Sequence, residues 1–362
     1  MRIELPTAAR RQNIESFTRR IEEPDETALT VVMPSTYFSV HPVVLAATAA
    51  AGLRSIEAGH PVVVESIPDT PSARYLDRMA LFSTLGVESG LAVHAKEEAG
   101  RFVPINVIRS GRQLTSFLID IVPLLHAETP EQIEPIRYAL SELVRNTLEH
   151  AGFSTPSVIA AQVYAKTGVI SIGVADCGTG IRKSLARSYE TDTDLEAVQL
   201  AMRPGVTGTT RAPGGTADNA GAGLFFCKSM ALTSRNYMVL HSGTGLFKLL
   251  TPRNDAEARV LYGDPSLDRA TRYDDMPGWP GTFVGIDIKL NAFAEFNMFM
   301  DYVRTAYSVD VQSAKRATVK RSGRFESRFQ SRPRSVPSRR VKRLRSCFAR
   351  RECYRPSLAG RT

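Results

Sequence analysis

The 362-residue sequence predicts an α+β protein in which a small α/β unit precedes a larger domain. Three observations predict this class. Apolar residues recur at helical spacing through 130–151, whereas 157–164 and 169–175 alternate between apolar and polar residues as paired strands do. Glycine-rich segments then follow at 176–180 and 221–224. One long helix beside antiparallel strands, with glycine-rich turns at their ends, is typical of the α+β class.

The first quarter of the chain predicts the smaller unit. Residues 1–26 are polar and charged, and we expect a loose leader there with one short helix near 11–22. Residues 27–100 predict strand, helix, strand and helix, at 29–33, 43–57, 61–65 and 72–85. This order resembles the small STAS-like modules. We interpret this unit as a dimerisation or docking domain without catalysis of its own, so we expect a homodimer contact or a protein partner here.

The larger domain is expected to span residues 101–310. A strand at 102–108 and a helix at 113–125 precede the long helix. Thr129, Pro130 and Gln132 resemble a helix-starting capping box, and Pro135 is expected to bend or restart the helix. One face carries apolar residues, and Glu142, Asn146 and Glu149 or His150 fall on another.

The remaining elements follow in chain order. A Gly-, Thr- and Pro-rich segment at 204–215 predicts a loop without regular structure. The aspartates of the segment 252–280 predict a solvated loop more readily than a metal site. Helices are expected at 193–202, 223–233 and 293–307, and strands at 237–241, 246–251 and 281–288.

The glycine segments predict contact with a ligand. A carboxylate at a strand end, such as Asp176, can accept a hydrogen bond from an amino group, while Gly178 and Gly180 let the backbone approach a ligand. Gly221 and Gly223 open an apolar helix, and a helix N-terminus favours phosphate.

The order of these motifs resembles the GHKL superfamily of ATPases over residues 105–291. The matching residues are Glu-x-x-x-Asn in ELVRNTLEHAG, then Asp-x-Gly-x-Gly, then Gly-x-Gly-Leu. The form of the first motif is closest to soluble histidine-kinase-like ATPases and anti-sigma-factor kinases. The resemblance implies a Bergerat-type two-layer sandwich, with a mixed sheet and helices on one face, that binds ATP and Mg²⁺. The segment 204–215 corresponds to the family's ATP lid.

The resemblance also assigns roles to residues. Asn146 is expected to hold Mg²⁺, and Glu142 to orient or deprotonate the attacking nucleophile, roles that also suit their chemistry. Asp176 and Thr282 are expected near adenine. The remaining expected ATP contacts are Arg145, His150, Gly178, Gly180, Gly221, Gly223 and Leu224.

Three functions remain open at this point. The chain is an ATPase switch in which Glu142 activates water, an anti-sigma-type kinase in which a partner serine is the nucleophile, or a nucleotide-binding module without significant turnover. A histidine kinase of the usual kind is disfavoured, because none of the six histidines is followed by a phosphoacceptor sequence of that class.

Composition places further bounds on the chain. The sequence contains no apolar run of membrane-spanning length and no apolar core of a signal peptide, so we expect a cytoplasmic protein without a membrane partner. Its four cysteines show no close pairing that would indicate a zinc site or a disulfide framework.

The final segment, 311–362, differs sharply in charge from the rest. It holds 17 Lys and Arg against two Glu, a net of +15, whereas residues 1–310 carry 29 basic and 35 acidic residues, a net of −6. Such a composition predicts a disordered tail. Its interleaved aromatic residues make RNA or DNA a candidate partner. A shifted reading frame would produce the same abrupt change, and would leave the tail without function.

Overall fold

The chain has a mixed α/β fold, which confirms the expected class at that level. The computed structural model describes residues 1–10, 12–22, 28–92, 102–124, 130–152, 155–206, 222–258, 260–289 and 298–308. The predicted cap Thr129, most of the predicted lid, Gly221 and the basic tail 311–362 lie outside these residues. Within the described part, no helix combines the length and apolar character needed to cross a membrane.

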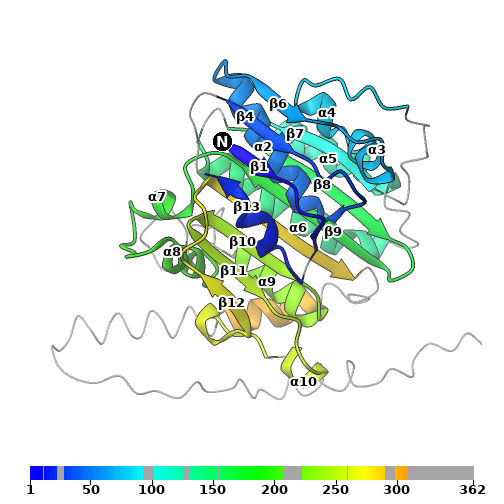
Figure 1. Cartoon of the computed structure of the whole chain (residues 1–362). Helices are drawn as coiled ribbons and strands as arrows, with labels where there is room; N and C mark the ends of the chain where they lie inside the picture. Colours follow the sequence, from blue (N-terminus) through cyan, green and yellow to red (C-terminus); the bar gives the residue numbers. More distant parts are fainter. Residues whose placement is uncertain are drawn as a thin grey trace, which may run out of the picture.

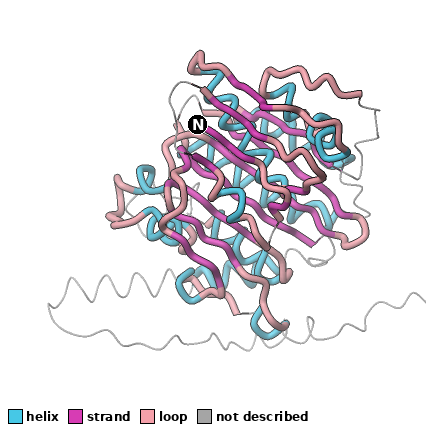
Figure 2. The backbone as a smooth tube through the Cα atoms, in the orientation of Figure 1, coloured by secondary structure: helices cyan, strands magenta, loops and turns pink. Residues whose placement is uncertain are grey.

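A seven-stranded sheet forms the centre of the molecule (Figures 1 and 2). All six neighbouring pairs are antiparallel, so the expected mixed sheet is wrong for this layer. Pro104 lies where the register of the edge strand shifts, which is where a residue without an N–H is tolerated. In spatial order the strands are β12 (Ala270–Tyr273), β11 (Gly245–Leu249), β10 (Met238–Gly243), β13 (Trp279–Lys289), β9 (Val169–Asp176), β8 (Ser157–Tyr164) and β7 (Phe102–Ile108).

Helices cover one face of this sheet. Alternate strand residues such as Ile172 and Ile286 share an apolar core with α5 (Gly111–Leu124), α6 (Pro130–His150) and α9 (Gly223–Thr233). Pro135 lies inside α6, which continues through it as a single helix. A further helix, residues 298–308, packs on the same core.

The opposite face is covered by the N-terminal unit, so the expectation of helices on one face only is also wrong (Figure 1). Helix α2 (Pro42–Glu57) crosses β9 and β13 at Gly173 and Gly285, which are cross-strand partners. A Cβ atom at Gly173 would lie 2.3 Å from the backbone of Val43, so glycine is what permits this contact. His41 Nε2 also lies 3.1 Å from Asp287 Oδ1, both side chains being buried. The N-terminal unit and the sheet therefore share one apolar core.

The expected loose leader is wrong. Residues 2–4 form β1 (Arg2–Glu4) between β3 (Ile21–Glu22) and β4 (Leu29–Val32), and β6 (Val62–Glu65) completes this small sheet. Instead of a helix over 11–22 there is one turn, α1 (Glu15–Thr18), and a short parallel pair joins β2 (Ala8–Ala9) to β5 (Ser39–Val40). The strand β1 buries Ile3 completely, which anchors it.

Two other expectations need correction. The helix expected at 72–85 is divided into α3 (Pro71–Arg78) and α4 (Leu81–Thr84), because Ala80 has a left-handed φ of 61°. The segment 252–280 holds α10 (Asp255–Ala258), a 3₁₀ turn (Pro265–Leu267) and β12. Its Asp268 is buried in an ion pair of 2.5 Å with Lys228 rather than solvated.

Candidate functional site

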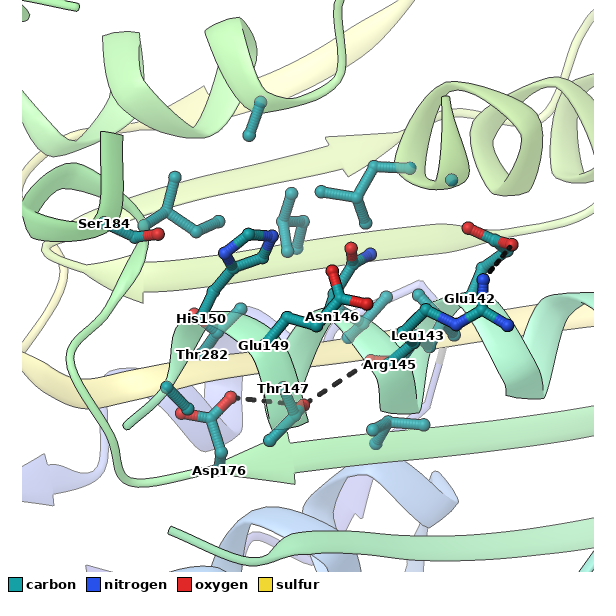
Figure 3. A pocket seen from close by; sticks show the side chains of 18 of the residues that line it. Glu142, Leu143, Arg145, Asn146, Thr147, Glu149, His150, Asp176, Ser184 and Thr282 are labelled. Atoms are coloured by element: carbon teal, nitrogen blue, oxygen red, sulfur yellow. Dashed lines mark hydrogen bonds and ion pairs between the residues drawn. The ribbon is translucent and has the colours of Figure 1, made fainter. Parts of the chain in front are cut away.

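The polar residues of α6 lie at the rim of a cavity of about 280 Å³. The helix buries Ile136, Leu140 and Val144 against the sheet. Residues spaced one helical turn apart on the adjacent face of the same helix therefore point toward the cavity. Figure 3 shows Glu142, Asn146 and His150 projecting from α6 on this side.

The strand ends supply the second wall. Asp176 ends β9 and is the cross-strand partner of Thr282 on β13, so the two residues lie at the same level of the sheet. Gly178 donates its N–H to Asp176 Oδ1 at 2.9 Å. A Cβ atom at Gly178 would lie 2.2 Å from the carbonyl oxygen of Ala151, which explains why this turn requires glycine. The glycine loop is thus packed against the end of α6.

Nine of the eleven predicted site residues line this one cavity. Gly178 supports the cavity through Asp176 without lining it, and Gly221 lies outside the described residues. The nine are Glu142, Arg145, Asn146, His150, Asp176, Gly180, Gly223, Leu224 and Thr282.

Burial controls the charge of Asp176, which is 4% exposed. Burial raises the pKa of Asp176 to about 7, although hydrogen bonds from Gly178, the Thr282 backbone and Thr147 favour the charged form. Thr147 Oγ1 lies 3.5 Å from Asp176 Oδ2 (Figure 3). The carboxyl group therefore changes charge near neutral pH, where a ligand that donates hydrogen bonds would favour the ionised form.

Glu142 lies at the other end of the cavity. Burial raises the pKa of Glu142 above its ordinary value, the guanidinium of Arg145 opposes this rise, and Glu149 adds to it. Arg145 Nη1 is 4.0 Å from Glu142 Oε1. Burial likewise lowers the pKa of His150, against the opposing effect of Glu149. Both shifts favour the neutral forms of these side chains.

The N-terminus of α9 meets Glu142 directly. A Cβ atom at Gly223 would lie 2.4 Å from Glu142 Oε2, so a larger residue there would displace the Glu142 carboxylate. Ala222 occupies the N-cap position and provides no side-chain cap. Asn146 Nδ2 is buried without a hydrogen-bond partner among the described residues. A helix end that Ala222 leaves without a side-chain cap, and an amide unpaired among the described residues beside a carboxylate, suit an anionic ligand with its counter-cation.

Sequence reasoning missed several lining residues. Tyr138 lies one turn before Glu142, and that i, i+4 spacing is a signal that could have identified it. Thr147 has no sequence signal for a site residue, and only its contact with Asp176 reveals this role. Ser184 on α7 (Ile181–Leu185) and Val206, just after α8 (Asp194–Ala201), have no sequence signal.

The acidic side chains of the described ranges are not arranged for a metal ion. Within those ranges, no three His, Cys, Asp or Glu side chains gather in a way that would hold one. Of the aspartates between 252 and 280, Asp255 pairs with Arg235, Asp264 with Arg203, and Asp274 accepts the N–H of Leu195.

A second, larger cavity of about 560 Å³ lies at the other end of the central strands. His41, Ser171 and Asp287 contribute to its lining, and Ser171 Oγ donates to Asp287 Oδ1 at 2.5 Å. These residues belong to the face that α2 covers, so the two cavities lie on opposite faces of the sheet.

Comparison with known proteins adds no assignment, since no protein-family model, curated protein or solved structure matches this chain.

Proposed function

We propose that this chain binds Mg-ATP in the α6 cavity and uses its binding and hydrolysis as a conformational or signalling switch, as a GHKL-type ATPase with a Bergerat-type fold. One observation carries the proposal. Glu142, Asn146, Asp176, Gly223 and Thr282 are separated by up to 140 positions in the sequence, yet they line one cavity.

The Asp176 end suits the adenine base. Asp176 and Thr282 offer hydrogen-bond acceptors, and the apolar side chains of Val174, Leu240 and Val284 line the same space. A flat, apolar base with an amino group on its edge matches such walls and such a polar end. The match supports adenine binding at this end of the cavity.

The α9 end suits the phosphates. Its N-terminus, to which Ala222 gives no side-chain cap, favours negative charge, and Arg145 at the rim adds a positive side chain. Asn146 can turn its amide to present Nδ2 to a phosphate oxygen or Oδ1 to a cation, and its Nδ2 has no partner among the described residues. Asn146 would therefore hold Mg²⁺, which when bound neutralises phosphate charge.

Glu142 is the proposed general base. In hydrolysis, the oxygen of water forms a bond to the terminal phosphorus while the bond from that phosphorus to the bridging oxygen of ADP breaks, and Glu142 accepts the proton from water. A carboxylate whose pKa is raised by burial is a better proton acceptor than an exposed one. In the alternative reaction of a protein kinase, a partner serine hydroxyl takes the place of water.

Incubation of the purified chain with γ-labelled ATP and Mg²⁺ tests the proposal. We expect labelled inorganic phosphate from the wild-type chain and a large loss of it from Glu142→Gln, which keeps the shape of the side chain but cannot accept the proton. Label on a protein instead of free phosphate would favour the kinase. If ATP bound and neither product formed, the chain would be a nucleotide-binding module without turnover. Absence of ATP binding would refute the proposal.

A further inference from the structure

Ser242, at the end of β10, connects the two segments that form the Asp176 end of the cavity. Its side chain is 3% exposed. The hydroxyl accepts the N–H of Ile181 at 2.9 Å, just after the glycine loop, and donates to the carbonyl oxygen of Gly281 at 2.7 Å. Thr282 Oγ1 lies 3.2 Å from Ser242 Oγ. Ser242 itself does not line the cavity, so it acts through these neighbours.

The direction of each hydrogen bond follows from the chemistry of the partners. A backbone N–H can only donate and a carbonyl oxygen can only accept, so the single proton of Ser242 is directed to Gly281. In the third contact Ser242 can therefore only accept, and Thr282 must donate. Because Thr282 has one hydroxyl proton, only its lone pairs remain for a ligand.

Asp176, on the neighbouring strand, also offers only hydrogen-bond acceptors to a ligand. Thr282 and Asp176 are cross-strand partners and both line the cavity. An ionised carboxylate can only accept hydrogen bonds. Two neighbouring acceptors favour a group that carries two N–H donors, which an exocyclic amino group has and an oxo group lacks.

We propose that Ser242 is a positioning residue that sets base specificity: by taking the proton of Thr282, it makes the cavity select 6-aminopurine over 6-oxopurine nucleotides. This inference rests on the proposed function and goes beyond it, since it assigns discrimination between bases to a residue outside the cavity. Without Ser242, the Thr282 hydroxyl is free to rotate and donate to an oxo group.

The test compares affinities for ATP and for inosine triphosphate by calorimetry with Mg²⁺ at pH 8, where Asp176 is ionised. We expect the wild-type chain to bind ATP at least about tenfold more tightly, and Ser242→Ala to reduce that ratio by about tenfold, the effect of one mismatched polar contact. Ser242→Thr keeps the hydroxyl and should keep the ratio. Ser229→Ala is the control, because that buried serine donates within α9 at 2.8 Å.

A merely structural role gives a different pattern. If Ser242→Ala weakened both nucleotides by the same factor, the ratio would stay constant and the inference would be overturned. Should Ser242→Ala fail to fold, Thr282→Val removes the acceptor itself and should also lower the ratio; an unchanged ratio there would overturn the inference equally. Lack of binding of either nucleotide to the wild-type chain would refute the proposed function and this inference together.

Discussion

Replacement of Asp176 by Asn should stabilise the ligand-free protein at neutral and alkaline pH. Burial raises the pKa of Asp176 from 3.8 to about 7, so the folded state holds a proton that the unfolded state releases. The contribution of Asp176 to stability is therefore fully present below pH 3.8 and is lost as the pH rises through about 7. At about 1.4 kcal/mol for each pKa unit, the loss is on the order of 4 kcal/mol.

The Asp176→Asn variant avoids this loss because the amide stays neutral and can still accept the Gly178 N–H. Urea unfolding of both proteins at pH values from 5 to 8 measures the effect. Because the other titrating groups contribute equally to both proteins, their contributions cancel in the difference between the two free energies of unfolding. We expect Asp176→Asn to gain stability over the wild-type chain progressively toward pH 8 while Mg-ATP binding is lost. Asp301→Asn is the control, since that side chain is 76% exposed. A difference independent of pH would refute the reasoning, and so would a destabilised variant at pH 8.

Three further perturbations follow from the same structure. Asn146→Ala should abolish Mg-ATP binding while Glu142→Ala keeps binding and loses turnover by at least about a hundredfold, because a general base contributes mainly in the transition state; equal loss of binding in titration calorimetry would contradict these roles. Gly173→Ala places a methyl group 2.3 Å from the α2 backbone and should cost about 1–3 kcal/mol in denaturant unfolding, whereas Gly111→Ala, with nothing within 4 Å, should be tolerated. Deletion of residues 313–362 should leave ATP hydrolysis unchanged, and loss of activity would mean that the tail completes the site.

The cavity was largely predictable because local patterns encode its parts. Helical periodicity predicted that Glu142 and Asn146 share one face of α6, and the apolar run before Asp176 predicted that this carboxylate lies at a strand end. The docking of α2 was not predictable, because the role of Gly173 depends on its cross-strand partner Gly285 and on a helix 130 positions earlier. Pairings over such distances leave no periodic signal in one sequence.

The short elements were not predicted from the sequence, for a related reason. The strand β1 has three residues, too few for a period of two to be visible, and it forms only because β3 and β4 flank it. Ser242 lay just beyond a predicted strand, and its function depends on three partners from distant segments. The burial of the Lys228–Asp268 pair was likewise not predicted, because charged side chains are expected at the surface.

Amide hydrogen exchange of the whole chain, with and without saturating Mg-ATP, tests the central claim most directly, because it reports where a ligand acts. We predict protection of residues 142–151, 176–186 and 222–226, which border the α6 cavity, and unchanged exchange at 37–41, which border the larger cavity on the other face. Protection confined to 37–41, or none at millimolar Mg-ATP, would contradict the assignment of the nucleotide site.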